Sequence, residues 1–311
     1  MIMSIFKLPL NIAKKSMASG DVKFNKSHRT YGNFNVKKDL NYICDDTSDH
    51  RLDIYTNPER RNNILLFYVH GGAYIYGQKE DHRVFISWFV EKGFDFVSIN
   101  YRLGEKDGSV SVMDQVKDAF EALKFVEENK HQYGIKTDNV FLVGDSAGGQ
   151  ICMLLDILLK NKEMQDYYKI KDVPNIEIKG IALNSTMYDY DSVIKMGLKH
   201  LTRGGRKWMF SNKYLDPEFV KINNPAYYYR NGYKPSSLFA SSSYHDYFRS
   251  QTLKLKRECD ELGIDLDYLF EASVNPKIGH VYNHFNFENE EGLRCNTRMK
   301  DYFLKHSSVA K

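Results

Sequence analysis

The sequence predicts an α/β fold in which a doubly wound, mainly parallel sheet is covered by helices on both faces. Two observations on this 311-residue chain predict it. Near-continuous apolar runs such as NILLFYV and FDFVSIN are typical of strands buried on both faces. Helix-like segments alternate with such runs over most of the chain. We therefore expect a single domain spanning residues 1–311.

The elements follow in chain order. In the helix-like segment 111–134, residues Val112, Val116, Phe120, Leu123 and Val126 place apolar side chains on one face. The expected strands are VKKDLNYIC, RLDIYTN, NILLFYV, FDFVSIN, NVFLV, IKGIALNS, PSSLFASSS and DLDYLFEA, and the expected helices are EDHRVFISWFVEKG, residues 111–134, GQICMLLDILLK, SQTLKLKRECDELG and a last one after Glu288.

One segment interrupts this alternation. From residue 186 to 233 no strand fits, and TMYDYDSVIKMGLKHL and RKWMFSNKYL are expected as short helices. A connection this long between two sheet strands usually forms a lid or a binding loop. Its apolar side chains fit either an acyl pocket or the insertion's own core: Met187, Tyr188, Met196, Trp208, Met209 and Phe210.

Charge and cysteine content exclude several classes of protein. The 44 basic and 40 acidic residues are spread along the chain, which argues against a nucleic-acid partner. The four cysteines form no C-x-x-C pair, so we expect reduced thiols, a cytoplasmic location and no zinc site. The N-terminal segment carries Lys7 and lacks a basic region before its apolar stretch, so it is expected to pack on the protein rather than serve as a leader. No apolar run reaches the roughly 18 residues of an integral membrane segment.

Ser146 lies in the stretch VGDSAGGQ, between an apolar strand and an apolar helix. Glycines on both sides permit a sharp turn that lifts the serine oxygen above the sheet edge, as a nucleophile requires. An ordinary turn with a small residue at the helix start is the alternative. Nucleophilic catalysis also needs a base, a group that orients the base, and donors for the oxyanion.

Such donors are expected in HGGAY, which directly follows the strand NILLFYV. We expect an oxyanion hole formed by the Gly71, Gly72 and Ala73 segment together with the N–H of Ala147. The side chains of His70 and Asp145 are expected to hydrogen-bond to neighbouring loops instead of taking part in the chemistry.

In this order and spacing, HGGAYIYG, SINYRL and VGDSAGG resemble the hormone-sensitive-lipase-like branch of the α/β-hydrolase esterases. The resemblance covers about residue 50 to the C-terminus. It implies an eight-stranded, mostly parallel sheet and a helical cap, which here corresponds to residues 1–35 and 186–233. Relatives with three glycines are often linked to esters of bulky tertiary alcohols, and Ala73 at the third position argues against that preference here.

The family order of nucleophile, acid and histidine implies that the acid and the base follow Ser146 in the chain. Asp246 comes just past the strand PSSLFASSS, whereas Asp265 and Asp267 begin the next strand and belong to the opposite edge of the sheet. His280 and His284 both lie in the loop after the last strand. We favour His280, which is nearer the strand end, and expect a packing or surface role for His284.

These residues predict a serine carboxylesterase that hydrolyses small, short-chain acyl esters through Ser146, His280 and Asp246. A sugar deacetylase, amidase or peptidase with the same triad remains an alternative, as does a non-catalytic binding protein on the same fold. His245 beside Asp246 has no partners at metal-ligand spacing, so neither a catalytic metal nor another cofactor is expected. The expected partner is a small-molecule ester, and homo-oligomer formation is left open.

Overall fold

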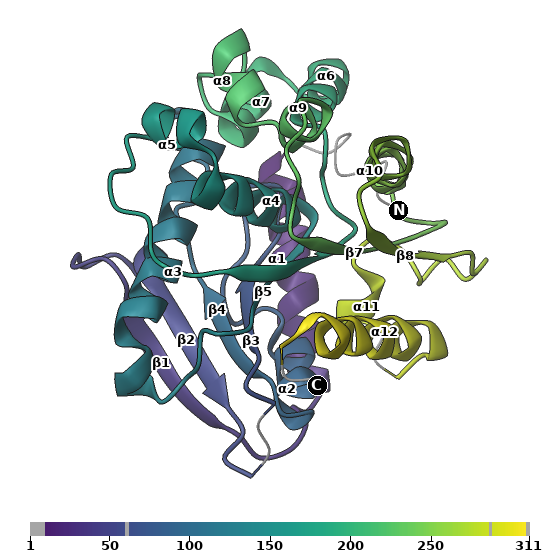
Figure 1. Cartoon of the computed structure of the whole chain (residues 1–311). Helices are drawn as coiled ribbons and strands as arrows, with labels where there is room; N and C mark the ends of the chain where they lie inside the picture. Colours follow the sequence, from purple (N-terminus) through teal and green to yellow (C-terminus); the bar gives the residue numbers. More distant parts are fainter. Residues whose placement is uncertain (1–9, 60–61, 286–287, 309–311) are drawn as a thin grey trace.

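The computed structural model describes residues 10–59, 62–285 and 288–308. Within them, eight strands form one sheet in the order β1-β2-β4-β3-β5-β6-β7-β8 (Figure 1). The β1–β2 and β2–β4 pairs are antiparallel and the other neighbouring pairs are parallel. The prediction of an eight-stranded, mostly parallel sheet is therefore confirmed. The strands are β1 (Asn35–Asn41), β2 (Arg51–Thr56), β3 (Leu65–Val69), β4 (Asp95–Ile99), β5 (Val140–Asp145), β6 (Ile178–Asn184), β7 (Ser237–Ser243) and β8 (Leu266–Glu271).

Both faces of the central strands are buried, which explains their uninterrupted apolar runs. In β3, Leu65 and Phe67 point into the core that contains residues of α3, α4 and α10. The intervening Leu66 and the following Tyr68 point into a second core, which contains residues of α2 and α12. The covering helices are α2 (Arg83–Glu91), α3 (Val112–Tyr133), α4 (Ser146–Lys160), α10 (Arg249–Leu262) and α12 (Glu290–His306). Three shorter helices complete the connections: η1 (Ser48–His50), α5 (Lys162–Tyr168) and α11 (Tyr282–Phe285).

The segment between β6 and β7 holds four helices, where the sequence pattern predicts two. They are α6 (Tyr190–His200), α7 (Arg203–Phe210), α8 (Pro217–Ile222) and α9 (Pro225–Arg230), and they gather at one end of the molecule (Figure 1). The two extra helices begin at prolines. Each proline follows a side chain that caps the helix: Asp216 accepts from the backbone N–H of Phe219, and Asn224 accepts from that of Ala226.

The N-terminal segment forms the helix α1 (Leu10–Ser27), while residues 1–9 of the predicted cap lie outside the described residues. The side chain of Asn25 donates to the backbone oxygen of Asp81 at 3.0 Å, and Arg83 donates to that of His28 at 2.8 Å. These contacts hold α1 against the segment that leads into α2. None of the described helices has the length and apolar character that crossing a membrane requires.

Candidate active site

Ser146 occupies a sharp turn between β5 and α4. Strand β5 ends at Asp145 and the helix begins directly at Ser146, whose φ of 50° lies in the left-handed region. A non-glycine residue in this region is strained, and such strain is common at functional sites. A Cβ atom at Gly148 would lie 2.1 Å from the backbone oxygen of Val69. The small residues of VGDSAGG therefore allow α4 to pack tightly against β3.

Asp246 and His280 come from two separate turns and meet through a hydrogen bond. Asp246 lies just past β7, and His280 lies in the loop between β8 and α11. Nδ1 of His280 is 2.8 Å from Oδ1 of Asp246. Because a carboxylate accepts, Nδ1 carries the proton and Nε2 is left with the lone pair that a general base needs.

The environment of Asp246 favours the carboxylate form. Burial by itself would raise the pKa of Asp246, but the neighbouring His280 and further hydrogen bonds hold this pKa below its ordinary value. The further donors are the backbone N–H of Phe248 and the hydroxyl of Ser242, each at 2.8 Å. Asp246 is thus fixed in place as an acceptor for His280.

Ser146 and His280 line one cavity of about 420 Å³. Gly71, Gly72 and Ala73 line it as well, so the predicted nucleophile, base and oxyanion segment share one space. Of the six apolar side chains singled out in the segment 186–233, Met209 is among the lining residues. The other five pack in the hydrophobic core or against it.

His284 lies away from Asp246, in an aromatic cluster. Its ring stacks on that of Phe85 with centroids 3.8 Å apart, and its side chain is buried. Burial and the neighbouring histidines His82 and His280 lower the pKa of His284 well below its usual range. The structure therefore gives His284 a packing position and pairs His280 with the acid.

The oxyanion segment differs from expectation at Gly71. The backbone N–H of Gly71 donates to Oδ1 of Asp145 at 3.0 Å, so it is not available as an oxyanion donor. Ala73 has a φ of 53°, which turns the chain sharply after the glycine pair. The N–H groups of Gly72, Ala73 and Ala147 are left as the candidate donors.

Asp145 holds this segment in place. Its Oδ1 atom accepts from Gly71 and also from the hydroxyl of Tyr68, at 2.5 Å. The expectation that the Asp145 side chain bonds to a neighbouring loop is met. Asp145 is therefore a positioning residue for the turn that carries Gly72 and Ala73.

We expect Asp145→Ala to lower kcat about 10- to 100-fold, because small displacements of catalytic groups have effects of this size. Two buried donors, on Tyr68 and Gly71, would also lose their acceptor, at about 1–3 kcal/mol of unfolding free energy each. Asp145→Asn keeps an acceptor and should restore most of both losses. Ester turnover and urea unfolding of both variants test this, and wild-type kcat in Asp145→Ala would contradict it.

His70 supports the same loop from inside the core. Its Nδ1 bonds to the backbone oxygen of Gly71 at 2.8 Å, and its ring stacks on Tyr101 with centroids 4.4 Å apart. Complete burial lowers the pKa of His70 to about 4. His70 is neutral in the folded protein at physiological pH.

This burial predicts a loss of stability in acid. The folded pKa of about 4 lies below the unfolded value of about 6.5, so stability is complete above pH 6.5 and falls as the pH drops towards 4. Between pH 7 and pH 4.5, His70 should account for a loss of about 2–3 kcal/mol in the free energy of unfolding. In His70→Asn, which keeps an N–H donor for Gly71, urea unfolding should show a smaller loss between these two pH values. An equal loss in both proteins would contradict the assignment.

Most of the remaining cavity wall comes from residues that no sequence motif marks. Asp21 and Phe24 of α1 line the cavity, as do Asp81 and His82 before α2. The Asp21 carboxylate accepts from the hydroxyl of Tyr76, which ties α1 to the oxyanion segment. No periodic pattern in α1 marks these residues, because their position depends on how the helix packs.

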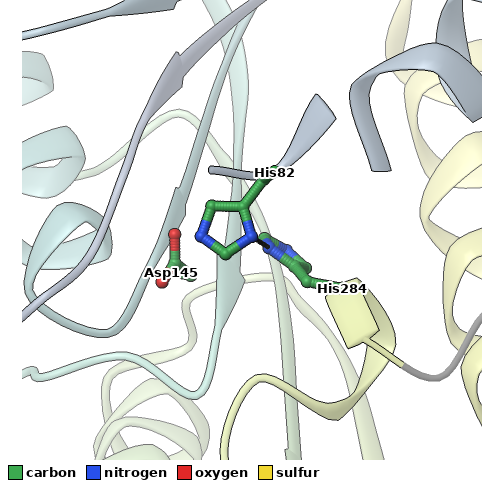
Figure 2. A group of neighbouring side chains, drawn as sticks. All are labelled: His82, Asp145 and His284. Carbon is green, nitrogen blue, oxygen red and sulfur yellow. Dashed lines mark hydrogen bonds between the residues drawn. The ribbon is translucent and has the colours of Figure 1, made fainter. Parts of the chain in front are cut away.

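Three of the buried polar side chains form a group that could hold a metal ion. His82, Asp145 and His284 each offer a ligand atom, and these atoms lie within 4.8 Å of one another. Figure 2 shows His82 between Asp145 and His284. Sequence spacing gave no sign of this group, since its members lie on α11, at the end of β5 and just before α2.

Comparison with known proteins adds a family assignment to this geometry. The profile of the family described as BD-FAE matches residues 52–256, and the three motifs singled out in the sequence lie within that range. An α/β-hydrolase of Acanthamoeba polyphaga mimivirus is 27% identical over 150 residues, covering 48% of this chain and 42% of the relative. An arylesterase of Saccharolobus solfataricus is 28% identical over 125 residues, covering 40% of each chain. The chain thus matches less than half the length of these two relatives.

Solved structures share the fold over nearly the whole chain. Esterase B of Lactobacillus rhamnosis superposes with a TM-score of 0.86 at 21% identity, covering 96% of this chain and 94% of that one. An esterase of the bacterial hormone-sensitive lipase family superposes with a TM-score of 0.68 at 17% identity, covering 92% and 89%. The resemblance to α/β-hydrolase esterases is confirmed.

Proposed function

Because the chain belongs to the BD-FAE family of α/β-hydrolases, we propose that it is a carboxylic ester hydrolase with Ser146 as nucleophile, His280 as general base and Asp246 as the orienting acid. One observation carries the proposal. The strained Ser146 and His280, which is hydrogen-bonded to Asp246, line one cavity, and the three residues follow three different strands. Ligand sites of open α/β sheets lie past the carboxyl ends of the strands.

The chemistry follows from these positions. Ser146 Oγ attacks the ester carbonyl carbon while its proton passes to Nε2 of His280, and Asp246 stabilises the resulting imidazolium. The bond from carbon to the alcohol oxygen then breaks, and His280 returns the proton to that oxygen. A water molecule adds to the acyl carbon, gives a proton to His280 and releases the acid, and Ser146 recovers its hydroxyl.

Backbone donors would stabilise the negative oxygen of the tetrahedral intermediate. The N–H of Ala147 lies at the start of α4, where the first N–H groups have no partner within the helix. Gly72 and Ala73 line the cavity together with Ser146. Together with the positive end of the α4 dipole they form the proposed oxyanion hole.

The cavity favours small substrates. Its volume of about 420 Å³ is at the lower end of the range of about 300–1,000 Å³ for small-molecule sites. Met17, Phe24 and Phe285 contribute apolar walls that suit a short acyl chain. We therefore propose esters with short acyl groups as the substrate class. The four free cysteines support a cytoplasmic location.

A series of p-nitrophenyl esters from acetate to palmitate tests this function. We expect kcat/KM to be highest for acyl chains of about two to six carbons and at least about 100-fold lower for palmitate, which exceeds the cavity. p-Nitroacetanilide is the amide control and should react far more slowly than the acetate ester. No turnover of any short ester would refute the proposal, and faster turnover of the amide would favour an amidase.

A further inference from the structure

His82, Asp145 and His284 form a group, here called the histidine cluster, whose members belong to three different parts of the fold. His82 directly precedes α2, Asp145 ends β5, and His284 lies on α11. Their ligand atoms lie within 4.8 Å of one another. Figure 2 shows how the three side chains are arranged. The catalytic steps described above use His280 and leave both histidines of this cluster without a chemical role.

The distance between the two imidazoles suits a metal ion. The Nδ1 atoms of His82 and His284 are 3.3 Å apart. Two nitrogens bound tetrahedrally to zinc at about 2.0–2.1 Å lie roughly 3.3–3.4 Å from each other.

The charges around the cluster favour a cation. His82 and Asp145 line the catalytic cavity, so an ion can reach them from there. The described residues of that cavity wall include the acids Asp21, Asp81 and Asp145 but neither lysine nor arginine. A lysine or arginine side chain in the cavity wall would repel a bound cation strongly at short range, whereas the carboxylates attract it.

We infer that the histidine cluster binds a divalent transition-metal ion of the zinc class. Two imidazoles and one carboxylate suit Zn²⁺, Co²⁺, Ni²⁺ or Cu²⁺, whereas Mg²⁺ and Ca²⁺ prefer oxygen ligands throughout. Binding requires the proton between the two Nδ1 atoms to move to Nε2 of the ring that carries it, because a neutral imidazole ligand binds through one nitrogen and keeps its N–H on the other.

Binding should inhibit ester hydrolysis through Asp145, a consequence that rests on the proposed function. The same carboxylate accepts from Gly71 and Tyr68 and so holds the oxyanion segment. Coordination withdraws negative charge from the Asp145 carboxylate. It also draws the carboxylate group towards the two histidines. The Gly71 turn then loses the acceptor that fixes its position.

Equilibrium dialysis of the chelator-treated full chain against Zn²⁺ tests the site independently of any activity. We expect one zinc ion per chain, and at least about tenfold weaker binding in both His284→Phe and His82→Gln. Phenylalanine preserves the ring stacking on Phe85, and the second variant guards against misfolding of the first. His245→Gln is the matched control, because His245 is half-buried, bonds to the backbone oxygen of Val274 and lies outside the cluster, and it should bind like wild type.

His280→Ala separates this site from the catalytic histidine and should also keep the zinc ion. With Co²⁺ in place of Zn²⁺, wild type should show the intense visible absorption of a four-coordinate site. The variants that lack one of the two cluster histidines should not show it. Absence of stoichiometric binding, unchanged affinity in both cluster variants, or loss of binding in His280→Ala alone would overturn the inference.

Turnover of p-nitrophenyl butyrate then tests the link to Asp145. Stoichiometric Zn²⁺ should slow wild type and His245→Gln, and the same concentration should have at least about tenfold less effect on His284→Phe, each relative to its own rate in chelator. A chain that holds one zinc ion at the cluster and turns over at an undiminished rate would contradict the coupling. A protein inactive in chelator as well would instead contradict the proposed esterase function.

Discussion

Ser146→Ala should lower kcat for p-nitrophenyl butyrate about 10⁴- to 10⁶-fold, equivalent to about 5–8 kcal/mol of activation free energy. Without Oγ no acyl-enzyme can form, and only water activated by His280 remains as a nucleophile. Alanine removes a single atom at a position that has a φ of 50°, so the turn and the cavity should persist. KM should change little.

Ser250→Ala provides the matched control for this substitution. Ser250 is exposed at the start of α10, away from the cavity wall, and its loss should leave turnover at the wild-type level. Thermal unfolding checks that both variants are folded. Turnover by a folded Ser146→Ala protein at more than about a hundredth of the wild-type rate would exclude Ser146 as the nucleophile.

His280→Ala should have a comparable effect, a loss of about 10⁴-fold or more in kcat. Ser146 then has no base to take its proton, and Asp246 is left buried without its strongest partner. The Asp246→Asn variant should lose about 10³- to 10⁴-fold, because an amide can hold the imidazole in the wrong tautomer. Initial rates on one short ester compare Ser146→Ala, His280→Ala and Asp246→Asn with wild type.

The competing histidine makes this test specific. His284→Phe in the absence of metal should retain far more activity than His280→Ala, because His284 packs on Phe85 and does not reach Asp246. If His284→Phe were inactive and His280→Ala active, the base would have to be reassigned to His284.

The sequence could predict the sheet and the strand-end positions because both depend on local pattern. Strands buried on both faces favour continuous apolar runs, and these mark β3, β4 and β5 clearly. Asp246 lies just past β7, and His280 lies in the loop after β8. Their places at one edge of a parallel sheet follow from chain direction, although their hydrogen bond depends on the exact loop conformation.

Other parts of the site depend on contacts between distant segments. His82 and His284 are 202 residues apart in the chain and meet only because α2 and α11 pack together. The hydrogen bond from the Gly71 N–H to Asp145 is equally invisible in the motif HGGAY, because the sequence does not distinguish among its three successive backbone donors. The two extra helices α8 and α9 had a readable signal, since Asp216-Pro217 and Asn224-Pro225 are typical helix starts.

The identity of the nucleophile can be tested most directly by trapping it with paraoxon, followed by intact-mass and peptide mass spectrometry. We predict one diethylphosphoryl group per chain, attached to Ser146, with loss of esterase activity in proportion to labelling. Ser146→Ala should remain unlabelled. A phosphoryl group on any other residue, or full inactivation without an adduct at Ser146, would contradict the assignment of Ser146 as the nucleophile that His280 and Asp246 activate.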